Sequence, residues 1–321
     1  MLAALRVTPH GLPFWAGSLW RVVIGEGGRD VRQACTNLVP DRRVYVLALP
    51  RSGIFAASSP LGELLTYRDL LYNLVARDLK VRYRGSALGF LWTLLNPLLM
   101  MAVFTLVFRV MTRRDIENFP QFALLGLLSW NFLAGSLTGA LHSITGNGNL
   151  INKVYFPREV LPLSVVIANL VNFLLTLPLY FVLAIVLRSA PPGPHIVFLP
   201  AIILLQTVFV AGLALILAAL NVLFRDTGAF LEVGLLAWFF LTPVFYQLEL
   251  LPNPSLLGLD IWRWVYILNP MATIVTDYRY LVLYNIPPIR MTLITAVEAV
   301  TLLALGWWFF RRVAPLFSEE V

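Results

Sequence analysis

The sequence contains little charge and almost none of the residues that form disulfides or hold metal ions. Asp, Glu, Lys and Arg make up only 13 % of its 321 residues. The single cysteine, Cys35, excludes an internal disulfide, and the three histidines lack the spacing of metal ligands. Paired carboxylates and a Ser/His/Asp arrangement are also lacking. We therefore expect no structural metal and no catalytic residues, and we do not expect an enzyme.

A phosphate-binding loop is missing as well. No stretch has the form GxxxxGKS or GxxxxGKT, in which backbone amides cradle the phosphates of a nucleotide. This chain is therefore not expected to bind and hydrolyse ATP in the usual way, and we expect it to hold no cofactor. The energy for its activity must come from elsewhere.

Long hydrophobic runs dominate what is present. With 59 % hydrophobic residues and a mean hydropathy of +0.79, the chain is too apolar for one water-soluble core. A helix needs about 20 apolar residues to cross roughly 30 Å of hydrocarbon. We predict an all-α integral membrane protein with six transmembrane helices, at residues 88–111, 119–144, 160–187, 196–224, 228–248 and 291–313. Residues 249–290 contain five prolines and are predicted to form two short helices outside the membrane or dipping into it.

The net charge of +7 comes from basic residues that lie beside the predicted spans. In a soluble protein this charge would suggest nucleic acid, but beside spans it favours lipid headgroups, so no nucleic-acid partner is expected. If residues 61–84 are cytoplasmic, ten Lys and Arg residues lie on the inner side and seven on the outer side. This bias follows the positive-inside rule, and six spans then place both termini in the cytoplasm.

Residues 61–84 have apolar positions at helical spacing and are too charged to cross a membrane. We predict an amphipathic helix on the cytoplasmic surface, with its apolar face in the headgroup region and its polar face toward water or a partner. A helix that only anchors the chain is the alternative. Residues 1–60 show no sustained period, and we assign them no role. The predicted apolar face contains Leu61, Leu64, Leu65, Leu71, Tyr72, Val75 and Leu79, and the charged positions of interest are Arg77, Asp78, Lys80, Arg82 and Arg84.

Four stretches at the predicted span boundaries resemble one family. They are ARDLKVRYRGSALGFLWTLLNPLLMM (76–101), NLINKVYFPREVLPLS (149–164), NVLFRDTG (221–228) and LNPMATIVTDYR (268–279). Together they are similar to the membrane subunits of type-2 ABC transporters that export O-antigen, teichoic acid, capsule and related lipid-linked glycans. The resemblance covers residues 61–321, with 61–84 as an interface helix and 85–321 as a six-span permease domain. It implies a multi-pass protein of the bacterial inner membrane.

The resemblance also implies partners and a coupling element. The partners would be a second copy of this chain, two ATP-binding subunits that carry ATP and magnesium, a lipid-linked glycan and membrane lipid. A multidrug-type or lipid-type ABC exporter is the alternative. The loop between the second and third spans would couple to the ATPase through an exposed aromatic pair, although these rings could instead belong to the interfacial aromatic belt. The coupling residues would be Asn152, Lys153, Tyr155, Phe156, Pro157, Arg158 and Glu159.

Aromatic side chains in the spans are candidates for a glycan pathway. Sugar rings offer C–H faces and hydroxyls, so aromatic rings with scattered polar groups suit them better than charges do. The first and fifth spans are the preferred walls because they carry the breaks Asn96-Pro97 and Thr242-Pro243. Packing in the core or against lipid is the alternative for each ring. The candidates are Trp92, Phe104, Phe108, Trp130, Trp238, Phe239, Phe245 and Tyr246.

Overall fold

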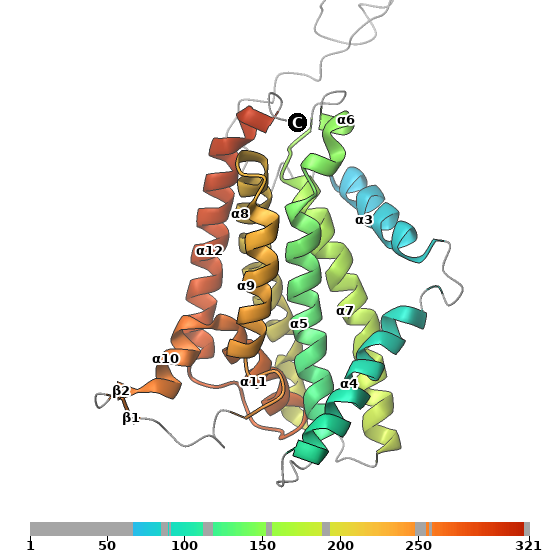
Figure 1. Ribbon diagram of the computed structural model, residues 1–321, viewed down its shortest axis with the longest axis vertical. Helices are drawn as coiled ribbons and strands as arrows, with labels where there is room; N and C mark the ends of the chain where they lie inside the picture. Colours follow the sequence, from blue (N-terminus) through green and yellow to red (C-terminus); the bar gives the residue numbers. More distant parts are fainter. Residues whose placement is uncertain are drawn as a thin grey trace, which may run out of the picture. The chain divides into compact units, whose positions relative to one another are not determined.

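Helices of apolar residues make up most of the computed structural model, shown in Figure 1. The structure describes residues 67–84, 89, 91–111, 118–151, 156–187, 193–247, 255–256 and 259–317. The long helices are α4 (Leu91–Met111), α5 (Phe119–Leu141), α7 (Val160–Val186), α8 (Leu199–Leu223), α9 (Thr227–Leu241) and α12 (Thr292–Val313). The shorter helical elements are α3 (Arg68–Tyr83), η1 (Thr145–Asn147), α6 (Gly148–Ile151), η2 (Pro194–Phe198), α10 (Ile261–Leu268), α11 (Pro270–Val282) and η4 (Ala314–Leu316).

Five of the described helical segments are long and apolar enough to cross a membrane: α4, α5, α7, η2 with α8, and α12 extended into η4. The fifth predicted span is shorter than expected, because α9 has 15 residues and ends at Leu241. At 1.5 Å per residue it is about 22 Å long, less than the roughly 30 Å of hydrocarbon. Pro243 lies two residues further on, where it cannot donate a helical hydrogen bond.

The region before α12 contains two short helices, as predicted. They are α10 and α11, and neither is long enough to span a membrane. Two strands of two residues each precede them, β1 (Ser255–Leu256) and β2 (Leu259–Asp260), paired antiparallel with Ser255 opposite Asp260. In Figure 1 α10, α11 and the strands lie at one end of the long helices, while α3, α6 and the end of α12 lie at the other.

The core is built around α5, whose residues are buried along most of its length. This helix packs against α4, α7, α8, α9 and α11, and Figure 1 shows it in the middle of the bundle. On the other side, α8 crosses α12 with glycines at the contact. A Cβ atom on Gly212 would lie 2.7 Å from the backbone nitrogen of Leu303, and a Cβ atom on Gly306 would collide with the carbonyl of Gly212. The two backbones can approach this closely only because these positions lack side chains.

Residues Thr66–Val321 form one compact unit. The predicted extension at residues 1–60, and the first residues of the predicted helix at 61–84, lie outside the described residues.

Candidate functional site

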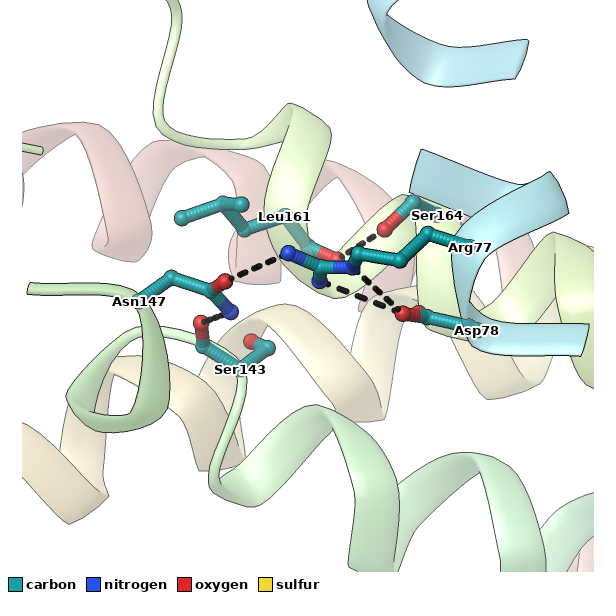
Figure 2. A network of polar contacts seen from close by, with 6 residues as sticks. All are labelled: Arg77, Asp78, Ser143, Asn147, Leu161 and Ser164. Carbon is teal, nitrogen blue, oxygen red and sulfur yellow. Dashed lines mark hydrogen bonds and ion pairs between the residues drawn. The ribbon is translucent and has the colours of Figure 1, made fainter. Parts of the chain in front are cut away.

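Arg77 of α3 contacts the helical turn that follows α5. Its Nη1 donates to Asn147 Oδ1 at 3.0 Å, and its Nε and Nη2 donate to Asp78 Oδ1 at 3.2 and 3.1 Å. Figure 2 shows this guanidinium between Asp78 on its own helix and Asn147, whose amide donates in turn to the carbonyl of Ser143 at 2.8 Å. The predicted interface helix and the start of the predicted coupling loop are thus joined at one end of the bundle.

The other predicted positions of α3 divide between the bundle and the surface. Arg82 Nη2 donates to Asn169 Oδ1 on α7 at 3.0 Å, whereas Lys80 and Arg84 are exposed. The helix packs along α7. The charged positions therefore do not act as one group, since Arg77 and Arg82 face neighbouring helices.

The buried residues of α3 match the predicted apolar face only in part. Tyr72 is 73 % exposed, while Leu74, which the prediction left out, is buried together with Val75. The helix packs along α7, and the side chains of Leu74 and Val75 are covered in this arrangement while that of Tyr72 is not. Exposed tyrosine suits a membrane interface, where its ring is apolar and its hydroxyl is wet.

The loop before α7 is hydrogen-bonded to the end of α12 and to η4. Glu159, at the N-cap position of α7, accepts a hydrogen bond from Arg311 Nε at 2.8 Å. Arg158 donates to the carbonyl of Ala314, and its guanidinium lies 5.9 Å from the centre of the Phe317 ring. We call these five residues the C-terminal clasp. The predicted coupling loop is held on one side by α12 and η4, which the sequence did not indicate.

Phe156 also departs from the prediction. It was expected as part of an exposed aromatic pair, but it is only 5 % exposed, and Pro157 is half-buried. Burial of a phenylalanine side chain stabilises the fold by about 1.5–3 kcal/mol, so a loop held close to the bundle favours the buried position. Asn152, Lys153 and Tyr155 lie outside the described residues.

Most of the predicted pathway aromatics pack on one another. Phe104 of α4 stacks on Phe245 with ring centres 3.8 Å apart, and Phe239 of α9 lies 5.6 Å from the same ring. Trp130 of α5 contacts Phe239 at 5.3 Å and Trp238 at 6.1 Å. Phe108 completes the set at 5.9 Å from Phe245. These six rings connect α4, α5 and α9, which agrees with the alternative of core packing, while Trp92 and Tyr246 line separate cavities.

The end of α9 is held by α11 and the residue before it. Asn269 donates to the carbonyl of Leu241 at 3.3 Å and accepts from Trp238 Nε1 at 2.8 Å. Arg279 is 3 % exposed, and its guanidinium donates to the carbonyls of Pro243, Val244 and Phe122. Its guanidinium carbon also lies over the Phe122 ring, 3.4 Å from the ring centre. The LNPMATIVTDYR stretch therefore supplies donors for carbonyls that are left free where α9 breaks.

Glycine at position 126 makes this contact possible. A Cβ atom there would lie 2.6 Å from the Val244 carbonyl oxygen and 2.7 Å from Arg279 Nη2.

Next to this site, a cavity of about 270 Å³ is lined by Tyr246, Tyr280, Tyr284 and Gln247, among others. Gln247 Nε2 donates to the Tyr284 hydroxyl at 2.7 Å. The carboxylate of Asp277, also on α11, accepts from the backbone of Ile289 at 2.9 Å and from the Thr292 hydroxyl at 2.6 Å.

A second cavity, of about 550 Å³, lies between the end of α3, α4, α5 and α7. Trp92, a predicted pathway residue, lines it, as do Arg82 of the predicted interface helix and Asn96 of the predicted break, next to polar residues that were not predicted. These are polar side chains in otherwise apolar helices, a signal that could have identified them because such residues in spans usually serve function. The polar lining residues are Arg82, Thr93, Asn96, Asn131, Asn169, Asn172 and Thr176, and aromatic rings come from Trp92, Phe132 and Phe173.

Comparison with known proteins gives a consistent result. The family model described as ABC-2 type transporter matches residues 69–283. The O-antigen export system permease protein RfbA of Myxococcus xanthus is 41 % identical over 260 residues, which cover 81 % of this chain and 98 % of that protein. An RfbA of Klebsiella pneumoniae is 32 % identical, covering 78 % of this chain and 94 % of its own length. The polysialic acid transport protein KpsM of Escherichia coli is 23 % identical, covering 76 % and 94 %.

Proposed function

The chain belongs to the ABC-2 type transporter family of membrane proteins, and from this premise we propose that it is the permease subunit of an exporter of lipid-linked polysaccharide. The observation that carries the proposal is the similarity, at 41 % identity, to almost the whole length of a permease named for O-antigen export. A further relative is named for polysialic acid transport. A multidrug-type or lipid-type exporter is not favoured by these relatives.

The permease works as a pair of identical chains with two separate ATP-binding subunits. This chain has no phosphate-binding loop of its own, so ATP and magnesium belong to the partner subunits. Six spans cross the inner membrane, with α9 as the short fifth one. The exposed apolar side chains of α4, α9 and α12 support a setting in lipid or against a second copy, since Leu106, Phe230 and Val297 are each at least 66 % exposed.

The ATP-binding subunits dock at the end of the bundle that carries α3, α6 and the C-terminal clasp. This end contains Lys80, Arg84 and Arg312 as exposed basic residues, which supports its placement at the cytoplasmic side together with both termini. Movement of the segment between α5 and α7 would then be passed directly to α7, to α12 through the pair of Glu159 and Arg311, and to α3 through the hydrogen bond of Asn147 with Arg77. In this mechanism the aromatic rings of α4 and α9 either line the glycan pathway or brace the helices that line it.

The test is ligand-stimulated ATP hydrolysis. The chain is purified together with its ATP-binding subunit and placed in lipid nanodiscs. A polyprenyl-pyrophosphate-linked glycan is expected to stimulate ATP hydrolysis, whereas a panel of hydrophobic drugs is not. Stimulation by the drugs, with no response to the glycan, would instead identify a multidrug-type permease.

A further inference from the structure

Four asparagines line one cavity between α3, α4, α5 and α7, and we propose that this cavity binds neutral sugar rings of the exported glycan within each copy of the chain. The proposal rests on the function proposed above, because it names a place where that substrate is held. At about 550 Å³ the cavity lies within the range of roughly 300–1,000 Å³ found for small-molecule sites. Its walls come from the end of α3, the first half of α4, and the middle parts of α5 and α7.

Amide side chains from three helices meet in this cavity. Asn96 is on α4, Asn131 on α5, and Asn169 and Asn172 on α7. An amide has both a donor and an acceptor, which complements a sugar hydroxyl that also donates and accepts. Buried Asn169 is held in place, since its Oδ1 accepts from Arg82 and its Nδ2 donates to the carbonyl of Val165 at 2.9 Å. The cavity thus contains at least one amide in a fixed position, with three more amides on the same walls.

The depth of these amides is a second reason. Asn131 lies near the middle of α5, and Asn172 lies near the middle of α7, so both belong to the central part of predicted spans. Asn96 and Asn131 are nevertheless exposed in the single chain. A polar side chain that faces hydrocarbon at this depth is unfavourable, so such residues usually face protein, water or a transported molecule. A sugar in the cavity gives the exposed amides of Asn96 and Asn131 a polar neighbour.

Aromatic rings supply the remaining walls. Trp92 is 47 % exposed at the cavity, and the rings of Phe132 and Phe173 stack with centres 5.6 Å apart. Flat apolar rings pack against the C–H faces of sugars while amides reach the hydroxyls. The glycine at position 135 also contributes, because a Cβ atom there would lie 3.0 Å from Asn169 Oδ1. A side chain at this position would press on the amide.

The charge of the cavity favours sugar rings over the phosphate of a lipid carrier. Among the described lining residues Arg82 is the one with a charge, and one N–H of its guanidinium is already donated to Asn169. Phosphate sites commonly combine several cationic or backbone donors. Four asparagines, two threonines and three aromatic rings with a single arginine are better suited to an uncharged polyhydroxyl ligand.

The experiment measures sugar binding by saturation-transfer NMR, using the complete complex of this chain and its ATP-binding subunit in nanodiscs. Maltotetraose serves as a neutral sugar probe, and inorganic pyrophosphate serves as the anionic competitor. The test variant is Asn96→Leu with Asn131→Leu, and Asn96→Gln with Asn131→Gln keeps the amides. The control is Thr138→Val, because Thr138 is exposed on α5 but does not line the cavity. Both altered asparagines are exposed, so neither leucine leaves a buried group without its partner.

We expect signal transfer to maltotetraose in the unaltered complex, in the glutamine variant and in the Thr138→Val control. The leucine variant should bind at least about tenfold more weakly, since each lost hydrogen bond is worth roughly 1 kcal/mol and 1.4 kcal/mol is tenfold. The proposal is overturned if the unaltered complex gives no signal, if the leucine variant retains it, or if pyrophosphate displaces the sugar and Arg82→Gln alone abolishes binding. ATP-driven transport of lipid-linked glycan is measured on the same preparations. If the unaltered complex does not transport, the proposed function fails; if it transports and the leucine variant still binds sugar normally, only the cavity assignment fails.

Discussion

A single buried arginine holds together the region where α9 ends. Arg279 donates to carbonyls from two different parts of the chain, at Phe122 on α5 and at Pro243 and Val244 after α9. Its contact with the Phe122 ring adds a cation–π interaction, which is stronger when both groups are desolvated. Because backbone carbonyls away from water must be hydrogen-bonded, the break at Thr242-Pro243 depends on this side chain.

Replacing Arg279 with leucine is therefore expected to destabilise the protein by at least about 3 kcal/mol, since each orphaned buried acceptor costs roughly 1–3 kcal/mol. Unfolding of the purified protein in mixed detergent micelles, followed by tryptophan fluorescence, measures this loss. Arg290→Leu is the matched control, because Arg290 is exposed and should change the stability very little. Equal stability of the two variants would show that the carbonyls do not need Arg279.

Asp277 predicts a pH dependence of stability. Its side chain is fully buried on α11, and burial raises the pKa of the carboxyl to about 6, while hydrogen bonds from Thr292 and Ile289 lower it. The folded protein therefore binds this proton more tightly than the unfolded chain does, whose carboxyl has the ordinary value of 3.8. The stabilisation is complete below about pH 4 and is lost as the pH rises to about 6.

The free energy of unfolding should accordingly fall between pH 4 and pH 7 by roughly 3 kcal/mol more in the natural protein than in Asp277→Asn, since one pKa unit is 1.36 kcal/mol. The comparison between the two proteins removes the contributions of other titrating groups. If the difference in unfolding free energy stays constant over this range, Asp277 titrates at its ordinary pKa.

At the scale of whole helices, the contact between α8 and α12 depends on two glycines. Gly212 and Gly306 face each other closely enough that a Cβ atom on either would meet backbone atoms of the opposite helix. In lipid there is little hydrophobic force between helices, so close packing of backbones at small residues is a main source of association. The crossing thus fixes α12, whose end carries the C-terminal clasp.

Gly306→Leu should push the two helices apart and lower the free energy of unfolding by about 1–3 kcal/mol, the range found for overpacked cores. Gly234→Leu on α9 is the control, because no atom lies within 4 Å of the Cβ position there. Thermal unfolding in detergent measures both variants. Similar melting temperatures for the two variants would mean that the close contact between α8 and α12 does not contribute to stability.

The C-terminal clasp predicts a link between α12 and ATP turnover. Arg311→Glu places two carboxylates together at Glu159 and should uncouple ATP hydrolysis from glycan export while the chain remains inserted. The double variant Glu159→Arg with Arg311→Glu restores an opposite-charge pair and should recover most of the export. Export and ATP hydrolysis are measured on the same vesicles, with Arg312→Glu on the adjacent exposed position as the control. Normal coupling in the Arg311→Glu variant would exclude this role of the clasp.

Local patterns were sufficient to predict most helices but not their contacts. The spans now seen as α4, α5, α7, α8 and α12 follow directly from long apolar runs. The fifth was predicted too long because Thr242-Pro243 was treated as a break within a span rather than as its end. The clasp between Arg158, Glu159 and α12 joins residues about 150 positions apart, a distance over which spacing carries no information. The amides of the cavity were visible in the sequence, but their meeting depends on how α4, α5 and α7 pack.

At the scale of the whole molecule, the family match begins at residue 69 and the compact unit begins at Thr66. Residues 1–60 precede both. A chain that starts near Pro60 is therefore expected to insert and to export glycan like the full chain, because the described contacts between Arg77 and Asn147 and between Arg311 and Glu159 lie beyond residue 66. Expression in membranes and an export assay measure this. Failure of the shortened chain to insert would assign the first sixty residues a role in assembly.

The proposed mechanism depends on a permease that has no energy source of its own. The most direct measurement is transport of polyprenyl-linked glycan into sealed vesicles under three conditions. The vesicles contain this chain alone, this chain and its ATP-binding subunit without ATP, or this chain and its ATP-binding subunit with ATP. Transport is predicted only in the last case, and a Walker-lysine variant of the partner should abolish it. Transport by the isolated chain, or transport with the partner in the absence of ATP, would contradict the central claim.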